Sequence, residues 1–264
     1  MRRINLGSST SLGDHGRARR DRASRGANPA ELSRSRMLEA IAHPVQLASR
    51  LRRHWLARRQ WLTSMEMRIV HLEELGLADE HRVDHVPSFG RTLPRILPQD
   101  EVGPYDVLLD LGSGMGRVVI SAAKTYSFRR IVGVEISPEL HEIAKRNLAR
   151  NRLCLRCPQI ELINADVLDY RIPDDVTVVY LYNPFRGPVF QHVVDELERS
   201  VDRNPREIRI IYLNPREERR LLASERINLV RSARAVLGDW STDSLVRLYR
   251  LRPAPTATLR RKPN

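Results

Sequence analysis

The sequence predicts an α/β fold: a mostly parallel, Rossmann-like sheet of about seven strands with helices on both faces, preceded by an N-terminal helical segment. From Pro104 onward, short apolar runs alternate with stretches of helical periodicity. The runs are apolar throughout, which is typical of parallel strands that helices cover on both faces. A glycine-rich loop links the first of these runs to a helical stretch.

Composition is ordinary for a soluble globular protein. The chain has 264 residues, of which 41% are hydrophobic and 29% charged. Its longest apolar run, around 176–182, is far shorter than the roughly 20 residues that cross a bilayer. No apolar block near the start suggests a secretory signal, and two cysteines cannot build a disulfide framework. We therefore expect a cytoplasmic protein without a membrane contact.

Positive charge is concentrated at both ends of the chain. Lys and Arg together number 45 against 32 acidic residues, which gives a net charge of +13. We expect residues 1–30, rich in Arg, Gly and Ser, to form a disordered basic tail, and residues 253–264 to form a second one. Such tails suit nucleic acid, although a codon bias toward arginine would produce the same excess. The sequence indicates no oligomeric state.

Residues 31–104 are predicted to form a helical extension followed by a lid segment. Apolar spacing predicts one or two helices within 30–59 and another over 61–75, which Gly76 would end. The stretch 79–104 is polar and rich in proline, with a short helix expected over 92–97.

Residues 105–252 are predicted to form the sheet domain. Strands are expected over 105–111, 130–135, 160–164, 176–182 and 208–213. Helices are expected over 117–126, 138–151, 187–199 and 215–222. The last two apolar stretches, 227–236 and 244–251, suit a closing antiparallel pair.

Polar residues follow four of the predicted strands. The first strand leads into Asp110-Leu-Gly112-Ser113-Gly114-Met-Gly116, where glycine allows sharp turns and close approach of a ligand to helix N-terminal amides. Glu135, Asp166 and Asn183 follow the next three strands. Because carboxyl ends of parallel strands share one edge, these groups are expected to converge on one ligand crevice.

These residues give the stretch 105–251 a resemblance to the class I S-adenosylmethionine-dependent methyltransferases. The segment 109–117 is similar to the first motif of that family, Val134-Glu135 to its second, and Asn183-Pro184-Phe185 to the motif after strand four. The segments 129–141 and 181–185 most resemble a little-characterised bacterial group, sometimes described as similar to histone-lysine methyltransferases.

The resemblance implies S-adenosylmethionine as cofactor and assigns most of the candidate site. Asp110 would hold the ammonium group, Glu135 the ribose, and Asp166 with Val167 the adenine. Asn183 and Phe185 are the candidate catalytic residues, which would orient an acceptor nitrogen. The full set of candidate cofactor-binding residues is Asp110, Gly112, Ser113, Gly114, Gly116, Glu135, Ile136, Asp166, Val167 and Asn183.

The methyl acceptor is expected to be a nitrogen on a protein or a small molecule. A nucleic-acid methyltransferase that uses the basic tails is the alternative. A nicotinamide-dependent oxidoreductase is less favoured, because Arg117 stands where a dinucleotide fingerprint has its third glycine. A non-catalytic binding module would also have this fold. No metal is expected, since Cys154 and Cys157 lack a second ligand pair.

Overall fold

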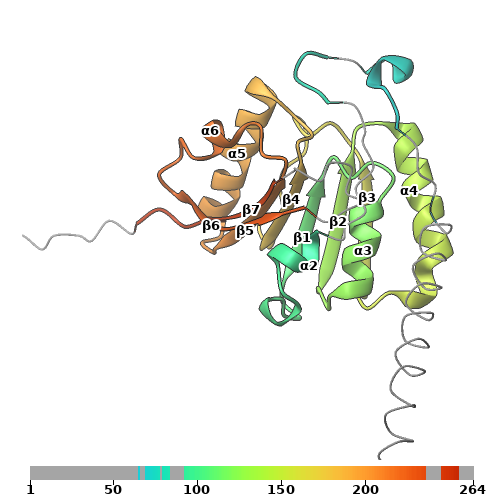
Figure 1. The fold of residues 1–264 in the computed structure, drawn as a ribbon, viewed down its shortest axis with the longest axis horizontal. Coiled ribbons are helices and arrows are strands. Elements are labelled where there is room, and N and C mark those ends of the chain that lie inside the picture. Colours follow the sequence, from blue (N-terminus) through green and yellow to red (C-terminus); the bar gives the residue numbers. More distant parts are fainter. Residues whose placement is uncertain (1–64, 66–68, 78, 84–91, 236–244, 256–264) are drawn as a thin grey trace, which may run out of the picture. The chain divides into compact units, whose positions relative to one another are not determined.

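The computed structural model describes residues 65, 69–77, 79–83, 92–235 and 245–255 (Figure 1). The predicted tail 1–30, the stretch 256–264 of the second predicted tail and the helices expected within 30–59 lie outside this part of the chain. Among the described residues, no helix is long and apolar enough to cross a membrane.

One seven-stranded sheet organises the domain, with strand order β3-β2-β1-β4-β5-β7-β6. The first five strands are parallel, whereas β7 runs antiparallel to both β5 and β6. This arrangement confirms the predicted fold class and the closing antiparallel pair. The strands are β1 (Val107–Leu111), β2 (Arg130–Glu135), β3 (Gln159–Asn164), β4 (Val178–Tyr182), β5 (Ile208–Leu213), β6 (Ile227–Arg234) and β7 (Leu245–Leu251).

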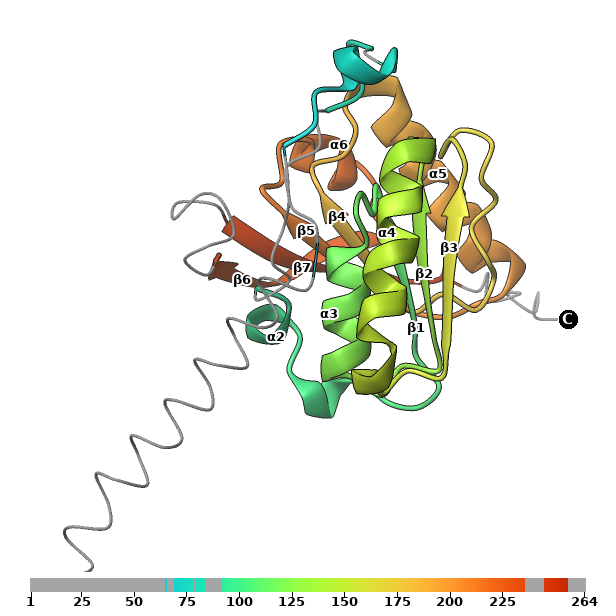
Figure 2. The same cartoon turned by 90° about the vertical axis from the view of Figure 1, so that its right-hand side faces the viewer.

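Helices cover both faces of the sheet (Figures 1 and 2). On one face lie α2 (Leu93–Ile96), α3 (Arg117–Thr125) and α4 (Pro138–Asn151). The other face is covered by α5 (Gly187–Arg203), which contacts the short α6 (Glu218–Leu221). Single 3₁₀ turns are η1 (Leu72–Leu75), η2 (Gln99–Glu101) and η3 (Arg152–Cys154).

The core has two layers, one on each face of the sheet. On the α5 side, Leu109 and Leu111 belong to a cluster in which the rings of Phe190 and Tyr212 stack at 5.4 Å. On the α3 side, Leu108 packs in a second cluster with Tyr126. Successive residues of β1 therefore enter opposite layers, which explains why this strand is apolar without alternation.

The predicted helix over 61–75 is wrong for residues 69–71. These residues are not helical, and the regular structure that follows is limited to η1. Val70 is buried in a small cluster with Met115, Leu140 and Ile143, while Ile69 is exposed. Tertiary packing of the β-branched Val70 thus overrides the helical spacing. Gly76, with φ +65°, does end the turn as expected.

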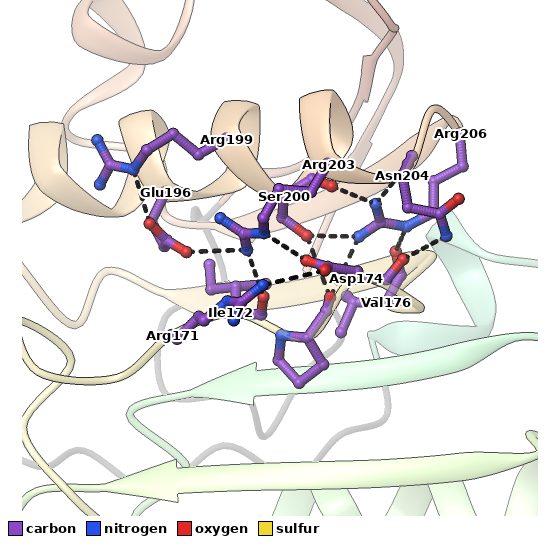
Figure 3. A network of polar contacts seen from close by, with 11 residues as sticks. Arg171, Ile172, Asp174, Val176, Glu196, Arg199, Ser200, Arg203, Asn204 and Arg206 are labelled. Atoms are coloured by element: carbon purple, nitrogen blue, oxygen red, sulfur yellow. Dashed lines mark hydrogen bonds and ion pairs between the residues drawn. The ribbon is translucent and has the colours of Figure 1, made fainter.

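A network of arginine contacts ties the loop before β4 to the C-terminal half of α5 (Figure 3). Arg203 donates to the Ile172 carbonyl at 2.9 Å, to the Asp174 carboxylate at 2.7 Å and to the Glu196 carboxylate at 3.1 Å. The network fixes the loop before the strand that carries Asn183 at its other end.

Arg206 is the most connected member of this network. Its guanidinium donates to the carbonyls of Val176 at 2.6 Å, Ser200 at 2.8 Å, Asn204 at 2.9 Å and Pro173 at 3.3 Å, and to the Ser200 hydroxyl at 2.7 Å. One side chain therefore satisfies carbonyls at the end of α5 and in the loop before β4.

We expect Arg206→Met to lower the free energy of unfolding by about 2–3 kcal/mol, because several carbonyls lose a charged donor. The matched control is Arg199→Met, which removes one half-exposed pair with Glu196 and should cost less than about 1 kcal/mol. Urea denaturation of both variants measures the difference. Equal losses would contradict the role given to Arg206.

Candidate functional site

A cavity opens at the carboxyl edge of β1, β2 and β4. The space between its walls is about 950 Å³, which includes the open solvent at its mouth. Nine of the predicted site residues line it: Asp110, Gly112, Ser113, Glu135, Ile136, Asp166, Val167, Asn183 and Phe185. The convergence expected from the four strand ends is therefore present.

The glycine loop after β1 has three residues in the left-handed region. The φ angles of Gly112, Gly114 and Gly116 are +77°, +53° and +75°. Gly114 and Gly116 stand outside the cavity wall. A Cβ on Gly116 would lie 3.0 Å from the Cβ of Ala144, so this glycine allows α4 to pack closely.

Gly112 allows the glycine loop to pack closely against the loop after β4. A Cβ at this position would lie 2.7 Å from the Cβ of Pro184. We expect Gly112→Ala to lower stability by about 2–4 kcal/mol, through left-handed backbone strain and displacement of Pro184. Thermal melting measures the loss.

Gly76→Ala is the matched control for that substitution. Gly76 has a similar φ of +65°, but a Cβ there meets no atom within 4 Å. Its substitution should cost only the backbone strain of about 1–2 kcal/mol. A Gly112→Ala variant no less stable than Gly76→Ala would show that contact with Pro184 is unimportant.

Glu135 is buried and holds the loops on both sides of it. Its carboxylate accepts hydrogen bonds from the N–H of Gly114 at 2.7 Å and from the N–H of Ser137 at 2.9 Å. Burial raises the pKa of Glu135, and the N–H groups of Ser137, Gly114 and Ile136 oppose that rise. The carboxylate therefore shapes the glycine loop and also lines the cavity.

Asp110 is a buried residue that lines the cavity. Its Oδ2 atom has no hydrogen-bond partner among the described residues. Burial, and secondarily the charge of Glu135, raises the pKa of Asp110 to about 8. A buried oxygen without a partner is costly, and a cationic ligand would supply the missing donor.

Asn183 also lines the cavity and has a second buried oxygen. It follows β4 with φ +46°, a conformation that asparagine tolerates better than most residues. Its Oδ1 atom has no hydrogen-bond partner in the part of the chain described. Phe185, two residues later, is half-buried in the wall. The site thus offers two acceptor oxygens, one acidic and one neutral, near an aromatic ring.

Asp166 lines the cavity, and both oxygens of its carboxylate accept hydrogen bonds within the protein. Arg82 donates to its Oδ2 at 2.6 Å, and the N–H of Leu168 donates to its Oδ1 at 3.0 Å. Sequence reasoning missed Arg82 because 84 positions separate it from Asp166. Arg117, which the sequence analysis did not place among the site residues, is buried in the wall of the cavity. Residues 84–91 of the predicted lid segment lie outside the described residues.

The cysteine pair lies away from the cavity. Cys154 is exposed, and Cys157 is buried with its thiol donating to the Gln159 carbonyl at 3.1 Å. Within the described ranges, no three His, Cys, Asp or Glu residues are grouped as metal ligands would be.

Part of the chain is similar to known methyltransferases. Residues 108–204 match the family model described as a methyltransferase domain. A protein-lysine N-methyltransferase of Saccharolobus islandicus is 38% identical over 69 residues, which cover 26% of this chain and 43% of that protein. The rRNA N(6)-adenosine-methyltransferase metl-5 of Caenorhabditis elegans is 39% identical over 62 residues, 24% of this chain and 28% of that protein.

A solved structure has a similar outline. Geranyl diphosphate C-methyltransferase from Streptomyces coelicolor, in complex with S-adenosyl-L-homocysteine, has a TM-score of 0.45 and 16% identity over 62% of this chain and 79% of its own. The chain spans less than half the length of the curated relatives named above. The match identifies residues 108–204 as a methyltransferase domain, in agreement with the expectation of an S-adenosylmethionine-dependent methyltransferase.

Proposed function

We propose that the protein transfers a methyl group from S-adenosylmethionine to a nitrogen atom of an acceptor. The observation that carries this proposal is that Asp110 and Asn183 line one cavity, and that Asp110 Oδ2 and Asn183 Oδ1 are buried with no hydrogen-bond partner among the described residues. The first suits the ammonium group of the cofactor, and the second suits an N–H group of the acceptor.

The residues that line the cavity fit the cofactor. Asp110 would hold the ammonium group, and Gly112 with Ser113 would lie against the methionine portion. Glu135 has a further lone pair on each oxygen for the ribose hydroxyls, besides the two N–H groups that it accepts. Asp166 and Val167 would contact the adenine. When bound, S-adenosylmethionine supplies an electrophilic methyl group on a positively charged sulfur.

The contribution of the protein to methyl transfer would be positioning. A direct displacement needs the acceptor lone pair in line with the methyl group, and good alignment lowers the barrier by several kcal/mol. The Asn183 oxygen can accept one N–H bond and so aim the nitrogen, while Phe185 covers a flat or cationic acceptor. Because the Asn183 oxygen is buried, water competes little for that bond.

The acceptor is proposed to be a protein or a small molecule in the cytoplasm, with nucleic acid as the alternative. The relatives named above are described as acting on protein lysine and on ribosomal RNA adenosine, which are both nitrogen acceptors. The neutral oxygen of Asn183 suits either.

Methyl transfer into a native bacterial extract tests this proposal. Radiolabelled S-adenosylmethionine is added with the wild-type protein or with Asn183→Ala, and the label is then released by protease, by nuclease or by passage through a small-pore filter. We expect label with the wild type and at least about tenfold less with Asn183→Ala, which loses one oriented hydrogen bond. Equal labelling by both proteins would contradict the role given to Asn183.

A further inference from the structure

A tight turn upstream of the sheet domain lies against the cavity. The N–H of His81 donates to the Asp79 carboxylate at 2.8 Å, and the N–H of Arg82 donates to the Asp79 carbonyl at 3.1 Å. These two bonds fix residues 79–82 in one local conformation. Arg82 and Val83 form part of the cavity wall.

The turn is attached by its backbone to the loop after β4. Arg82 and Phe185 form an antiparallel bridge, and the N–H of Arg186 donates to the His81 carbonyl at 2.8 Å. The His81 ring also packs over Gly187, where a Cβ would lie 3.1 Å from Nδ1. The backbone of Arg82 is therefore held beside the candidate catalytic residue Phe185.

The side chain of Arg82 extends from there to the loop after β3. Its Nη2 lies 2.6 Å from Asp166 Oδ2, and the two side chains are only 24% and 23% exposed. The N–H of Leu168 occupies the other carboxylate oxygen at 3.0 Å. Asp166 is thus held by one donor on each oxygen, and each oxygen keeps a lone pair for a ligand.

We propose that Arg82 is a positioning residue that makes Asp166 selective for the amino group of adenine. This inference rests on the proposed function, in which Asp166 contacts that base. An amino group can donate a hydrogen bond to a carboxylate, whereas an oxo group cannot. A carboxylate therefore discriminates between the two groups only if its oxygens are held toward that position. Without Arg82, Asp166 keeps one donor and gains rotational freedom, so discrimination falls.

Two ligands that differ at this position, and in the hydrogen that the oxo form carries on N1, test the inference. Calorimetry compares S-adenosylhomocysteine with S-inosylhomocysteine, in which an oxo group replaces the amino group. We expect Arg82→Ala to bind S-adenosylhomocysteine about tenfold more weakly than the wild type and to lose most of its preference over the inosine compound. Arg82→Lys should restore part of the affinity and part of the preference for S-adenosylhomocysteine. In an Asp166→Asn background, Arg82→Ala should have little further effect.

Arg129→Ala is the matched control. It removes an ion pair with the same geometry, Arg129 Nη2 to Asp175 Oδ2 at 2.6 Å, from the amino end of β2. It should leave both affinities unchanged. An Arg82→Ala variant with unchanged or tighter binding would overturn the inference. So would equal weakening for both ligands, which would assign Arg82 to general closure. If the wild type binds neither ligand, the result contradicts the proposed function, and the inference that rests on it is then wrong as well.

Discussion

Asp110→Asn is expected to abolish most cofactor affinity while making the protein more stable. The amide carries no charge to pair with the ammonium group of the cofactor, and loss of a buried ionic hydrogen bond of about 3 kcal/mol weakens binding roughly a hundredfold. The same substitution removes a buried carboxyl group whose Oδ2 has no hydrogen-bond partner within the described residues. Function and stability are thus opposed at this position.

The gain in stability should depend on pH. The pKa of Asp110 is raised to about 8 in the fold from 3.8, so the native state keeps a proton that the unfolded state releases. Wild-type stability contributed by this group is full below about pH 4 and is lost as pH rises to about 8. Asp110→Asn carries no such penalty, so its advantage should grow over this range to about 2–4 kcal/mol.

Cofactor affinity of the wild type should rise from pH 6 toward pH 8. Below its pKa of about 8, Asp110 must lose a proton to pair with an ammonium group, and this requirement weakens binding. Above about pH 8, the amino group of the ligand loses its own charge. Titrating S-adenosylhomocysteine into wild type and Asp110→Asn at several pH values, with parallel melting curves, measures both effects. Affinities within threefold of each other, or a less stable variant, would contradict the assignment.

Glu135 is expected to be needed for both affinity and stability. Glu135→Ala removes the proposed ribose contact and should weaken cofactor binding tenfold to a hundredfold, as expected for charge-assisted bonds of about 1.5–3 kcal/mol. It also leaves the N–H groups of Gly114 and Ser137 without their acceptor, so stability should fall by about 2–3 kcal/mol. The effect on stability is therefore opposite in sign to that of Asp110→Asn.

Glu135→Gln tests how far both effects depend on the charge of the carboxylate. Its amide keeps the shape of the carboxylate but points an NH₂ group at one of the two N–H donors, so part of both losses should remain. Glu142→Gln, on the exposed face of α4, is the control and should leave both quantities close to those of the wild type. Calorimetry and urea denaturation give the two readouts. A Glu135→Ala variant with wild-type affinity would remove Glu135 from the cofactor site.

Local sequence signals predicted most of the sheet domain. The bounds predicted for β2 and α4 agree with the structure at both ends. At α4 the reason is visible, because Pro138 occupies the first turn and the Ser137 hydroxyl accepts from the N–H of Leu140 at 3.2 Å. The strands that are buried on both faces were equally clear in the sequence, because each is a nearly continuous apolar run. The strand ends then brought Asp110, Glu135 and Asn183 to one cavity.

Features that depend on contacts between residues far apart in the chain could not be predicted from the sequence. The helix predicted across residues 69–71 gave way to burial of Val70 against α4. Arg82 carries no local signal, since only the fold brings it to Asp166. The pKa of Asp110 likewise reflects burial and the nearness of Glu135, neither of which an aspartate before a glycine loop reveals.

A crystal structure of the complex with S-adenosylhomocysteine tests the central claim most directly. The account predicts the ligand in the cavity, with its ammonium group within hydrogen-bond distance of Asp110 Oδ2, its ribose hydroxyls on Glu135 and its adenine beside Asp166. A ligand bound elsewhere, or in the cavity with Asp110 Oδ2 still without a partner, would contradict it.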